Sequence, residues 1–325
     1  MDMRAIVLDH PVEPEQLQVR RVPIPEPPAG WVRIKVEAFG LNRSEYHLRA
    51  GLATGATFPI IPGLEAVGTI DTAPGGEFEP GRKVAAMMGG MGRQYDGGYA
   101  EYVVVPVSSV VPVSTDLDWA TFGALPEMLQ TAHGSLFTGL AIEPGQSILI
   151  RGGTSSVGVA AAAIAKEHGL TVFSTTRNPN RLDVLREHGV DHPIVDDGNV
   201  AEKVREIRPD GVEAALELVG ANVLPDTLKA LAVHGTACFT GMLSDNWTIP
   251  AFYPMDYLPN GVRLTAYSGH SKGLPAAAFQ RYADLVAAGK LPIRIERVFA
   301  MEEIGAAHRM MADGKAVGKL VVQVN

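Results

Sequence analysis

The sequence predicts a mixed α/β protein, and three observations lead to this fold class. The first third of the chain carries short segments that alternate apolar and charged residues between turns rich in Gly and Pro. After residue 121, strand-like and helix-like segments alternate, which is typical of a parallel, doubly wound sheet with helices on both faces. Residues 266–325 then return to two amphipathic helices and a final strand. The α/β domain (122–265) is therefore expected to be inserted in a discontinuous domain made of 1–121 and 266–325.

The first domain is predicted to be rich in β-structure. The segment VRIKVEAFG alternates apolar and charged residues as a half-buried strand does. Its expected strands are 32–40, 65–70, 82–87 and 99–106, separated by turns such as APGG at 73–76. Short strands at such close spacing favour an antiparallel, barrel-like domain.

The inserted domain shows strands and helices with clear start and stop signals. Gly169 ends one helix, and a second helix is capped by Asn178-Pro179 and ends at Gly189. Its expected strands are 147–152, 171–176, 192–195, 212–219 and 236–241, and its expected helices are 156–168, 179–188, 200–208 and 223–232. In the C-terminal part we expect helices at 276–288 and 301–313 and a strand at 319–324.

Composition excludes several classes of function. The chain has 325 residues, 46% of them hydrophobic, and a net charge of −8 without basic blocks, so a nucleic-acid or anionic-membrane surface is not expected. Its single cysteine, Cys238, excludes an internal disulfide and a multi-cysteine zinc cluster. The start MDMRAIVLDH lacks the apolar core of a signal peptide, and no apolar run is long enough to span a bilayer. These features predict a soluble, cytoplasmic protein.

The strongest local motif is ILIRGGTSSVGVAAAAIAKEHG, a strand, a turn of small residues and a helix. Gly153 and Gly158 match the outer glycines of the G-x-G-x-x-G dinucleotide fingerprint, and Ser155 stands at the middle one. The small residues let a pyrophosphate approach the helix N-terminus, and the hydroxyls of Thr154, Ser155 and Ser156 are possible phosphate donors. Val157 completes the predicted loop. The alternative is a tight strand–helix turn that binds no nucleotide.

The end of the next strand indicates which dinucleotide is bound. An NAD-preferring site places Asp or Glu about 20 residues after the loop, on the ribose 2′-OH. This chain reads FSTTRNPNR, with Thr176, Arg177 and Arg181 and no acid. Guanidinium groups bind phosphate well, so these residues favour NADPH. In the alternative interpretation both arginines are solvated surface residues.

The order of motifs resembles the medium-chain dehydrogenase/reductase superfamily over essentially the whole length. The segments that carry the resemblance are AFGLNRSEYHLRAG, PGLEAVGTI, PGRKV, DGGYAEYVVV, ALPEMLQTA, GGTSSVG and GKLVVQV. The resemblance implies a GroES-like catalytic domain split around a Rossmann domain. It also implies dimerisation through the edge of the Rossmann sheet, so we expect a homodimer.

Within that superfamily the chain departs from the zinc enzymes. Their ligands would fall at Asn42, at Leu64 and at or near Glu127. Leu cannot bind a metal and an Asn amide is a poor zinc ligand, so no metal is expected. The chain looks instead like the zinc-free quinone oxidoreductase branch, which implies reduction of a quinone or α,β-unsaturated carbonyl by NADPH. One departure counts against NADPH: Asp196 stands where many members carry a Tyr that helps to bind the 2′-phosphate.

The resemblance also implies the site residues. Asn42 would lie beside the nicotinamide and the substrate carbonyl, and Tyr46 or His47 would donate a proton. Thr131 would contact the nicotinamide, and Gly241, Met242 and Leu243 would pack on its ribose. The alternatives are a turn cap for Asn42, a rim aromatic for Tyr46, a solvent-facing His47 and ordinary loop packing for 241–243.

The roles of three charged residues stay open at this point: Glu65, Glu127 and Lys319. Lys319 either reaches the cofactor or pairs with an acid such as Glu65. Glu127 is either a polar group of the site or a local ion-pair partner. We expect Glu65 to be held by an ion pair or by backbone N–H groups.

The sequence thus predicts a zinc-independent enzyme that transfers hydride from NADPH to a small carbonyl or quinone substrate. Two rivals remain: an alcohol or aldehyde dehydrogenase with a non-standard metal site, and a non-catalytic NADPH-binding protein with a structural or redox-sensing role.

Overall fold

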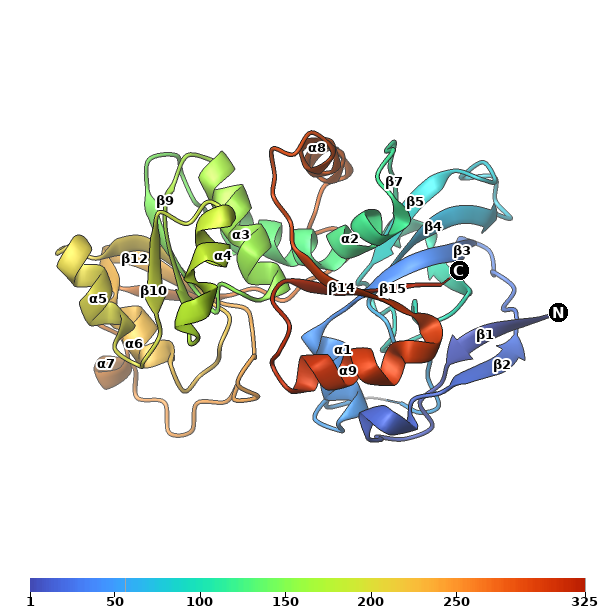
Figure 1. Cartoon of the computed structure of the whole chain (residues 1–325), viewed down its shortest axis with the longest axis horizontal. Coiled ribbons are helices and arrows are strands. Elements are labelled where there is room, and N and C mark those ends of the chain that lie inside the picture. The colour runs from blue at the N-terminus through green and yellow to red at the C-terminus, as the bar shows by residue number, and fades with distance from the viewer. Residues whose placement is uncertain (56, 325) are drawn as a thin grey trace. The chain divides into compact units, whose positions relative to one another are not determined.

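The computed structural model describes residues 1–55 and 57–324, whose contacts divide the chain into two compact units (Figure 1). Unit 1 comprises Met1–Met128, His270–Ala288 and Ile295–Asn325, and unit 2 comprises Leu129–Gly269 and Gly289–Arg294. The first boundary lies within helix α2 (Trp119–His133), later than the expected boundary at 121/122. This helix was not expected from the sequence, and it continues through Pro126 although proline normally breaks a helix interior.

Unit 1 is built on a seven-stranded sheet in which strand β3 is central. The sheet order is β14-β15-β3-β4-β5-β7, and β6 also pairs with β3. The strands of the unit are β1 (Asp2–Ile6), β2 (Val19–Pro23), β3 (Trp31–Leu41), β4 (Glu65–Thr72), β5 (Lys83–Met87), β6 (Tyr102–Pro106), β7 (Val110–Pro112), β14 (Ile295–Ala300) and β15 (Lys319–Gln323). Its other helices are α1 (Arg43–Arg49), α8 (Ala276–Ala287) and α9 (Ile304–Ala312).

The alternating sequence of β3 explains its central place. Val32, Ile34 and Val36 are fully buried, and the charged residues between them point away from the core. β3 pairs antiparallel with β4, β6 and β15, so the C-terminal strand completes the sheet started by the N-terminal third. Figure 1 shows the same return in the helices, where red α9 lies beside blue α1, and the two helices are in contact.

A buried aromatic pair joins α9 to the sheet. Tyr99 stacks on Phe39 of β3 at 4.5 Å between ring centroids, and its hydroxyl lies 3.2 Å from Nε2 of His308 on α9. Burial lowers the pKa of His308 to about 3, so the imidazole is neutral in the folded protein.

The buried imidazole makes unit 1 sensitive to acid. Because the folded pKa of His308 lies below the unfolded value, its contribution to stability is complete above about pH 6.5 and is lost as the pH falls towards 3. Between pH 6.5 and 4 the loss amounts to about 3 kcal/mol. We expect His308→Gln to remove this part of the pH dependence in urea unfolding curves, and the exposed control His10→Gln to retain it. Equal pH slopes for wild type and His308→Gln would contradict the assignment.

Unit 2 contains a six-stranded parallel sheet in the order β10-β9-β8-β11-β12-β13. Its strands are β8 (Ser147–Arg151), β9 (Thr171–Thr176), β10 (His192–Val195), β11 (Val212–Glu217), β12 (Leu231–Phe239) and β13 (Arg263–Ala266). Its helices are α3 (Ser156–Glu167), α4 (Leu182–Glu187), α5 (Val200–Ile207), α6 (Leu224–Lys229) and α7 (Pro254–Tyr257). In order of sequence the strands run 3-2-1-4-5-6, the doubly wound Rossmann topology, which confirms the predicted α/β fold class.

The expected bounds of unit 2 elements differ from the structure at two places, the junction between α6 and β12 and the start of α4. The predicted helix at 223–232 ends at Lys229, and β12 begins at Leu231 because this buried residue pairs with Val212 of β11. The predicted helix after Pro179 starts as one 3₁₀ turn, whose cap Asn178 accepts a hydrogen bond from the N–H of Asn180, and α4 proper begins at Leu182. Both deviations lie at element ends, where local propensity is weakest.

Candidate functional site

Unit 1 contains a buried polar cluster at the start of α1. Its members are Asn42, Glu45, Glu65, Glu127 and Lys319, none of them more than 8% exposed. The cluster brings together residues from β4, α1, α2 and β15, which the sequence separates widely. An unpaired charge would be very costly at this depth, so the hydrogen bonds inside the cluster decide its chemistry.

The ammonium group of Lys319 lies among oxygen atoms of this cluster. Its Nζ is 2.6 Å from Oε1 of Glu65, 3.5 Å from Oε2 of Glu127, and donates to Oδ1 of Asn42 at 2.5 Å. Lys319 is 0% exposed. Of the two readings left open by the sequence, the structure places Lys319 in the ion pair with Glu65.

Asn42 donates its hydrogen bonds within the same cluster. Its Nδ2 donates to Oε1 of Glu65 at 3.0 Å and to Oε1 of Glu45 at 3.2 Å, and its backbone N–H donates to Oε2 of Glu45. Both amide protons are therefore used internally. Asn42 thus organises the cluster, and its expected place beside the nicotinamide and the substrate carbonyl stays a prediction.

Glu45 was not predicted from the sequence. Its Oε1 also accepts a hydrogen bond from the N–H of Leu64 at 2.8 Å. A signal was present: the spacing Asn42-x-x-Glu45 is that of a helix capping box. Burial raises the pKa of Glu45 to about 7.

Pro126 explains how α2 supplies a backbone donor. Proline has no N–H and its ring disturbs the preceding turn, so the hydrogen-bond ladder of the helix is interrupted there. The N–H of the next residue, Glu127, donates to Oε2 of Glu65 at 2.7 Å. Glu65 is thus held by an ion pair and by a backbone N–H group, as the sequence analysis expected.

The charges of Glu65 and Lys319 are linked. Burial raises the pKa of Glu65 in spite of the adjacent ammonium. Burial also opposes the charge of Lys319, but Glu65 and Glu127 outweigh it and raise its pKa. Both shifts favour retention of a proton within the cluster at neutral pH.

This donor set does not suit zinc. Both oxygens of Glu65 already accept hydrogen bonds, Leu64 offers no ligand, and an ammonium group stands among the remaining oxygens. Within residues 1–55 and 57–324, no group of three or more His, Cys, Asp or Glu side chains is arranged to hold a metal ion. The residues therefore do not fit a catalytic zinc.

The predicted proton donors lie on α1 beside the cluster. Tyr46 is half-buried, with the guanidinium of Arg43 4.0 Å and that of Arg49 5.4 Å from its ring centroid. His47 is 5% exposed, so it does not face solvent as the alternative reading supposed. Its ring lies 5.4 Å from that of Tyr46.

In unit 2, the predicted phosphate loop joins β8 to α3 at the point where the strand order reverses, between β8 and β11. Ligands of open parallel sheets bind at such a point, at the carboxyl ends of the strands. A Cβ on Gly153 would collide with the hydroxyl of Ser174, and one on Gly158 would lie 2.6 Å from the carbonyl oxygen of Gly152. The two glycines therefore permit the close approach of strand, turn and helix that the fingerprint requires.

The serine at the middle position of the fingerprint forms two local hydrogen bonds. The hydroxyl of Ser155 donates to the carbonyl of Gly152 at 2.8 Å and accepts from the N–H of Gly158 at 3.1 Å. The oxygen of Ser155 thus caps α3, and its proton is donated to the Gly152 carbonyl. Within the described chain the hydroxyls of Thr154 and Ser156 make no such bond, so they keep the expected donor role open.

The remaining predicted cofactor residues lie around the carboxyl ends of the strands in the same sheet. Thr176 ends β9, with Arg177 exposed and Arg181 half-buried after it. Leu243 lies over the loop, since a Cβ on Gly152 would be 3.0 Å from its Cδ1, and the N–H of Gly241 donates to the carbonyl of Glu217. Thr131 is linked to these strand ends through Ser135, which donates to the Thr131 carbonyl and lies 2.9 Å from the hydroxyl of Thr240.

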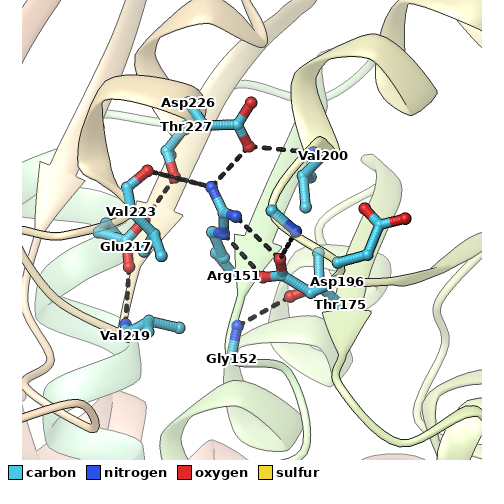
Figure 2. Close-up of polar contacts among 12 residues, drawn as sticks. Arg151, Gly152, Thr175, Asp196, Val200, Glu217, Val219, Val223, Asp226 and Thr227 are labelled. Atoms are coloured by element: carbon cyan, nitrogen blue, oxygen red, sulfur yellow. Dashed lines mark hydrogen bonds and ion pairs between the residues drawn. The ribbon is translucent and has the colours of Figure 1, made fainter.

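A buried arginine, Arg151, stands at the last position of β8 and was missed from the sequence (Figure 2). It is 0% exposed and forms ion pairs of 2.8 Å with both Asp196 and Asp226. The one available signal was a charged residue at the end of an otherwise apolar strand, SILIR. Burial opposes its charge, but Asp196 outweighs this effect and raises the pKa of Arg151.

No helix in the described part of the chain has the length and apolar character needed to cross a membrane.

Comparisons with known proteins match both parts of the chain. Residues 28–115 match the model of the alcohol dehydrogenase GroES-like domain, and residues 188–322 match that of a zinc-binding dehydrogenase. The chain is 29% identical over 246 residues to a quinone oxidoreductase of Rattus norvegicus, which covers 74% of this chain and 73% of the relative.

Two solved structures are similar over nearly the whole chain. An NAD-dependent alcohol dehydrogenase has a TM-score of 0.88 at 25% identity, covering 99% of this chain and 100% of the other. A mycobacterial protein in complex with NADPH has a TM-score of 0.87 at 24% identity, with the same coverage.

Proposed function

Because the chain belongs to the medium-chain dehydrogenase/reductase superfamily, in its quinone oxidoreductase branch, we propose that it transfers hydride from NADPH to a quinone or α,β-unsaturated carbonyl without zinc. The observation that carries this proposal is the ammonium of Lys319 among Asn42, Glu65 and Glu127. Asn42 and Glu127 stand at or near the places where the zinc enzymes have ligands, and here they surround a fixed cation.

The residues of unit 2 fit a dinucleotide. Gly153 and Gly158 leave the space that a Cβ would fill, and the loop leads directly into the N-terminus of α3. When bound, NADPH supplies the hydride. Arg177 and Arg181 would bind the 2′-phosphate, Thr154 and Ser156 the pyrophosphate, and Thr131 and 241–243 the nicotinamide half.

The residues of unit 1 would manage the charge that develops on the acceptor oxygen. Without a metal, this charge needs hydrogen-bond donors and then a proton. Tyr46 carries the more exposed of the two candidate donor groups, and His47 lies beside it. In this proposal Asn42, Glu45, Glu65 and Lys319 hold α1 in place, so that the donors keep their positions.

The test of the function is NADPH oxidation by the purified protein against quinones, enones and aldehydes in parallel, with metal analysis of the same sample. We expect oxidation with quinones or enones that a chelator does not abolish. Near-stoichiometric zinc would favour the alcohol dehydrogenase rival instead. Tight NADPH binding without turnover on any acceptor would favour the binding-only rival.

The choice of cofactor has its own test. Arg177→Ala with Arg181→Ala should lower the ratio of NADPH to NADH affinity about 100-fold, since two charge-assisted contacts to the 2′-phosphate are lost. The matched control is Arg186→Ala, which removes an exposed arginine of α4 that pairs with Asp183. Titration of both dinucleotides by fluorescence gives the ratio. A ratio equal to that of wild type would refute the 2′-phosphate assignment.

We also propose that the protein acts as a cytoplasmic homodimer. Strand β13 forms one edge of the unit 2 sheet, and the side chains of Tyr253 and Met255 in the same unit are 59% and 78% exposed. Such an edge and such apolar side chains are the kind of surface that a second copy covers. Sedimentation of the purified protein at the mass of one chain would contradict the dimer.

A further inference from the structure

Asp196 stands at a position that bears on cofactor choice. It follows β10 directly, and its backbone N–H donates to the carbonyl of Thr176 at 2.8 Å, so it lies beside the end of β9. In doubly wound nucleotide-binding sheets, a carboxylate at these carboxyl ends of the strands selects NAD by binding the ribose 2′-OH. A free carboxylate here would also repel a 2′-phosphate. The residue therefore conflicts with the use of NADPH unless its charge is compensated.

Arg151 compensates that charge from inside the sheet (Figure 2). Its Nε lies 2.8 Å from Oδ2 of Asp196, and its Nη2 lies 2.9 Å from Oδ1, so the pair is bidentate. Oδ1 of Asp196 also accepts the N–H of Gly198 at 3.1 Å. The side chain of Asp196 is 9% exposed. Both of its oxygens are thus engaged within the protein.

The other side of the guanidinium is fixed as well. Its Nη1 donates to Oδ2 of Asp226 at 2.8 Å, and to Val223 and Thr227 at 3.1 Å. Asp226 in turn accepts the N–H of Val200 at the start of α5. Arg151 is 0% exposed and lies at the end of β8, immediately before the phosphate loop. It therefore cannot reach the cofactor and acts only through its neighbours.

We propose that Arg151 is a positioning residue for cofactor specificity, which shares its charge between Asp196 and Asp226 and holds both oxygens of Asp196 so that a 2′-phosphate is accepted at the end of β9. This inference rests on the proposed NADPH site. It assigns the specificity of that site to two places, the arginines after β9 and the buried arginine of β8. The loss of Arg151 would release a carboxylate that binds a ribose 2′-OH and disfavours a phosphate.

The test uses the full chain and compares wild type with Arg151→Gln, Asp196→Asn and the double variant. Dissociation constants of NADPH and NADH are measured for each by fluorescence, at low and at high salt. Arg151→Gln should lower the NADPH:NADH affinity ratio about tenfold, the size of one screened charge interaction, and less so at high salt. Asp196→Asn should leave the ratio within about twofold, because the charge it removes is already compensated, and should restore the ratio in the double variant.

Several results would overturn the inference. One is an unchanged ratio in folded Arg151→Gln, and another is an Asp196→Asn variant whose NADPH preference rises about fivefold or more, since Asp196 would then be uncompensated in wild type. If Arg151→Gln does not fold, Arg151→Lys replaces it. Its ammonium cannot hold both oxygens, so a smaller shift in the same direction is expected and an unchanged ratio overturns the proposal.

The two proposals fail in different ways. If wild type binds NADH more tightly than NADPH, the proposed cofactor is wrong. The shift between wild type and Arg151→Gln still decides whether Arg151 controls the preference. A protein that is merely destabilised would lose affinity for both dinucleotides equally, and Asp196→Asn would not restore the ratio.

Discussion

Replacement of Lys319 by Met is expected to lower the free energy of unfolding of unit 1 by about 3–5 kcal/mol, the cost of breaking a buried ion pair from one side. Lys319 and Glu65 are both 0% exposed, and the Lys319 ammonium is the cation that lies 2.6 Å from Glu65. Met fills a similar volume, so the loss comes from the charge and not from a cavity. Urea unfolding in a Trp247→Phe background, followed by the fluorescence of Trp31 and Trp119, both in unit 1, measures it.

Two further variants separate charge from packing at Lys319. Glu65→Gln added to Lys319→Met should restore part of the stability, because the carboxylate that was left unpaired is removed. Lys315→Met, which breaks an exposed pair with Asp313, should leave the unfolding midpoint unchanged. Equal losses for Lys319→Met and the double variant would show that the ion pair is not the cause. Loss of turnover in Glu65→Gln with intact NADPH binding and stability would instead assign Glu65 to catalysis.

Gly158→Ala is expected to reduce dinucleotide affinity at least about 100-fold, since small misplacements at a binding site have effects of this size. The added Cβ would lie 2.6 Å from the carbonyl oxygen of Gly152 and 2.7 Å from the carbonyl carbon of Gly153. Both are backbone atoms, which cannot turn aside as a flexible side chain does. The helix must therefore move away from the loop, at a cost of about 3 kcal/mol in stability.

A substitution at the other end of α3 controls for general damage to the helix. Lys166→Ala removes an exposed side chain in its last turn, so NADPH affinity should change little. NADPH titration and urea unfolding of both variants give the two quantities. Wild-type affinity in Gly158→Ala would show that the turn does not need a glycine and that the fingerprint assignment is wrong.

The sequence predicted those features that depend on local patterns. The alternation in 32–40 defined β3, and the strand, small-residue turn and helix around Gly153 and Gly158 defined the loop. Helix α2 was missed because Pro126 argues against a helix locally, while its burial in the tertiary structure overrides that preference.

What the sequence left undecided were the partners of charged side chains. Lys319 had two possible roles, and its place beside Glu65 follows from the pairing of β15 with β3. Arg151 gave almost no signal, since its partners are far away in the sequence: Asp196 follows β10 and Asp226 lies on helix α6. Such contacts depend on which strand lies next to which, and local propensity does not encode that order.

The position of Lys319 in the chain has a consequence for the order of folding during synthesis. Lys319 follows Glu127 by 192 residues, and the segment 129–269 of unit 2 lies between them. Glu65 and Glu127 therefore leave the ribosome long before the cation that compensates them. Chains are made from the N-terminus and domains fold as units. Unit 2 can therefore complete its sheet before Lys319 of unit 1 has been synthesised. In the nascent chain the inserted domain matures before the domain that encloses it.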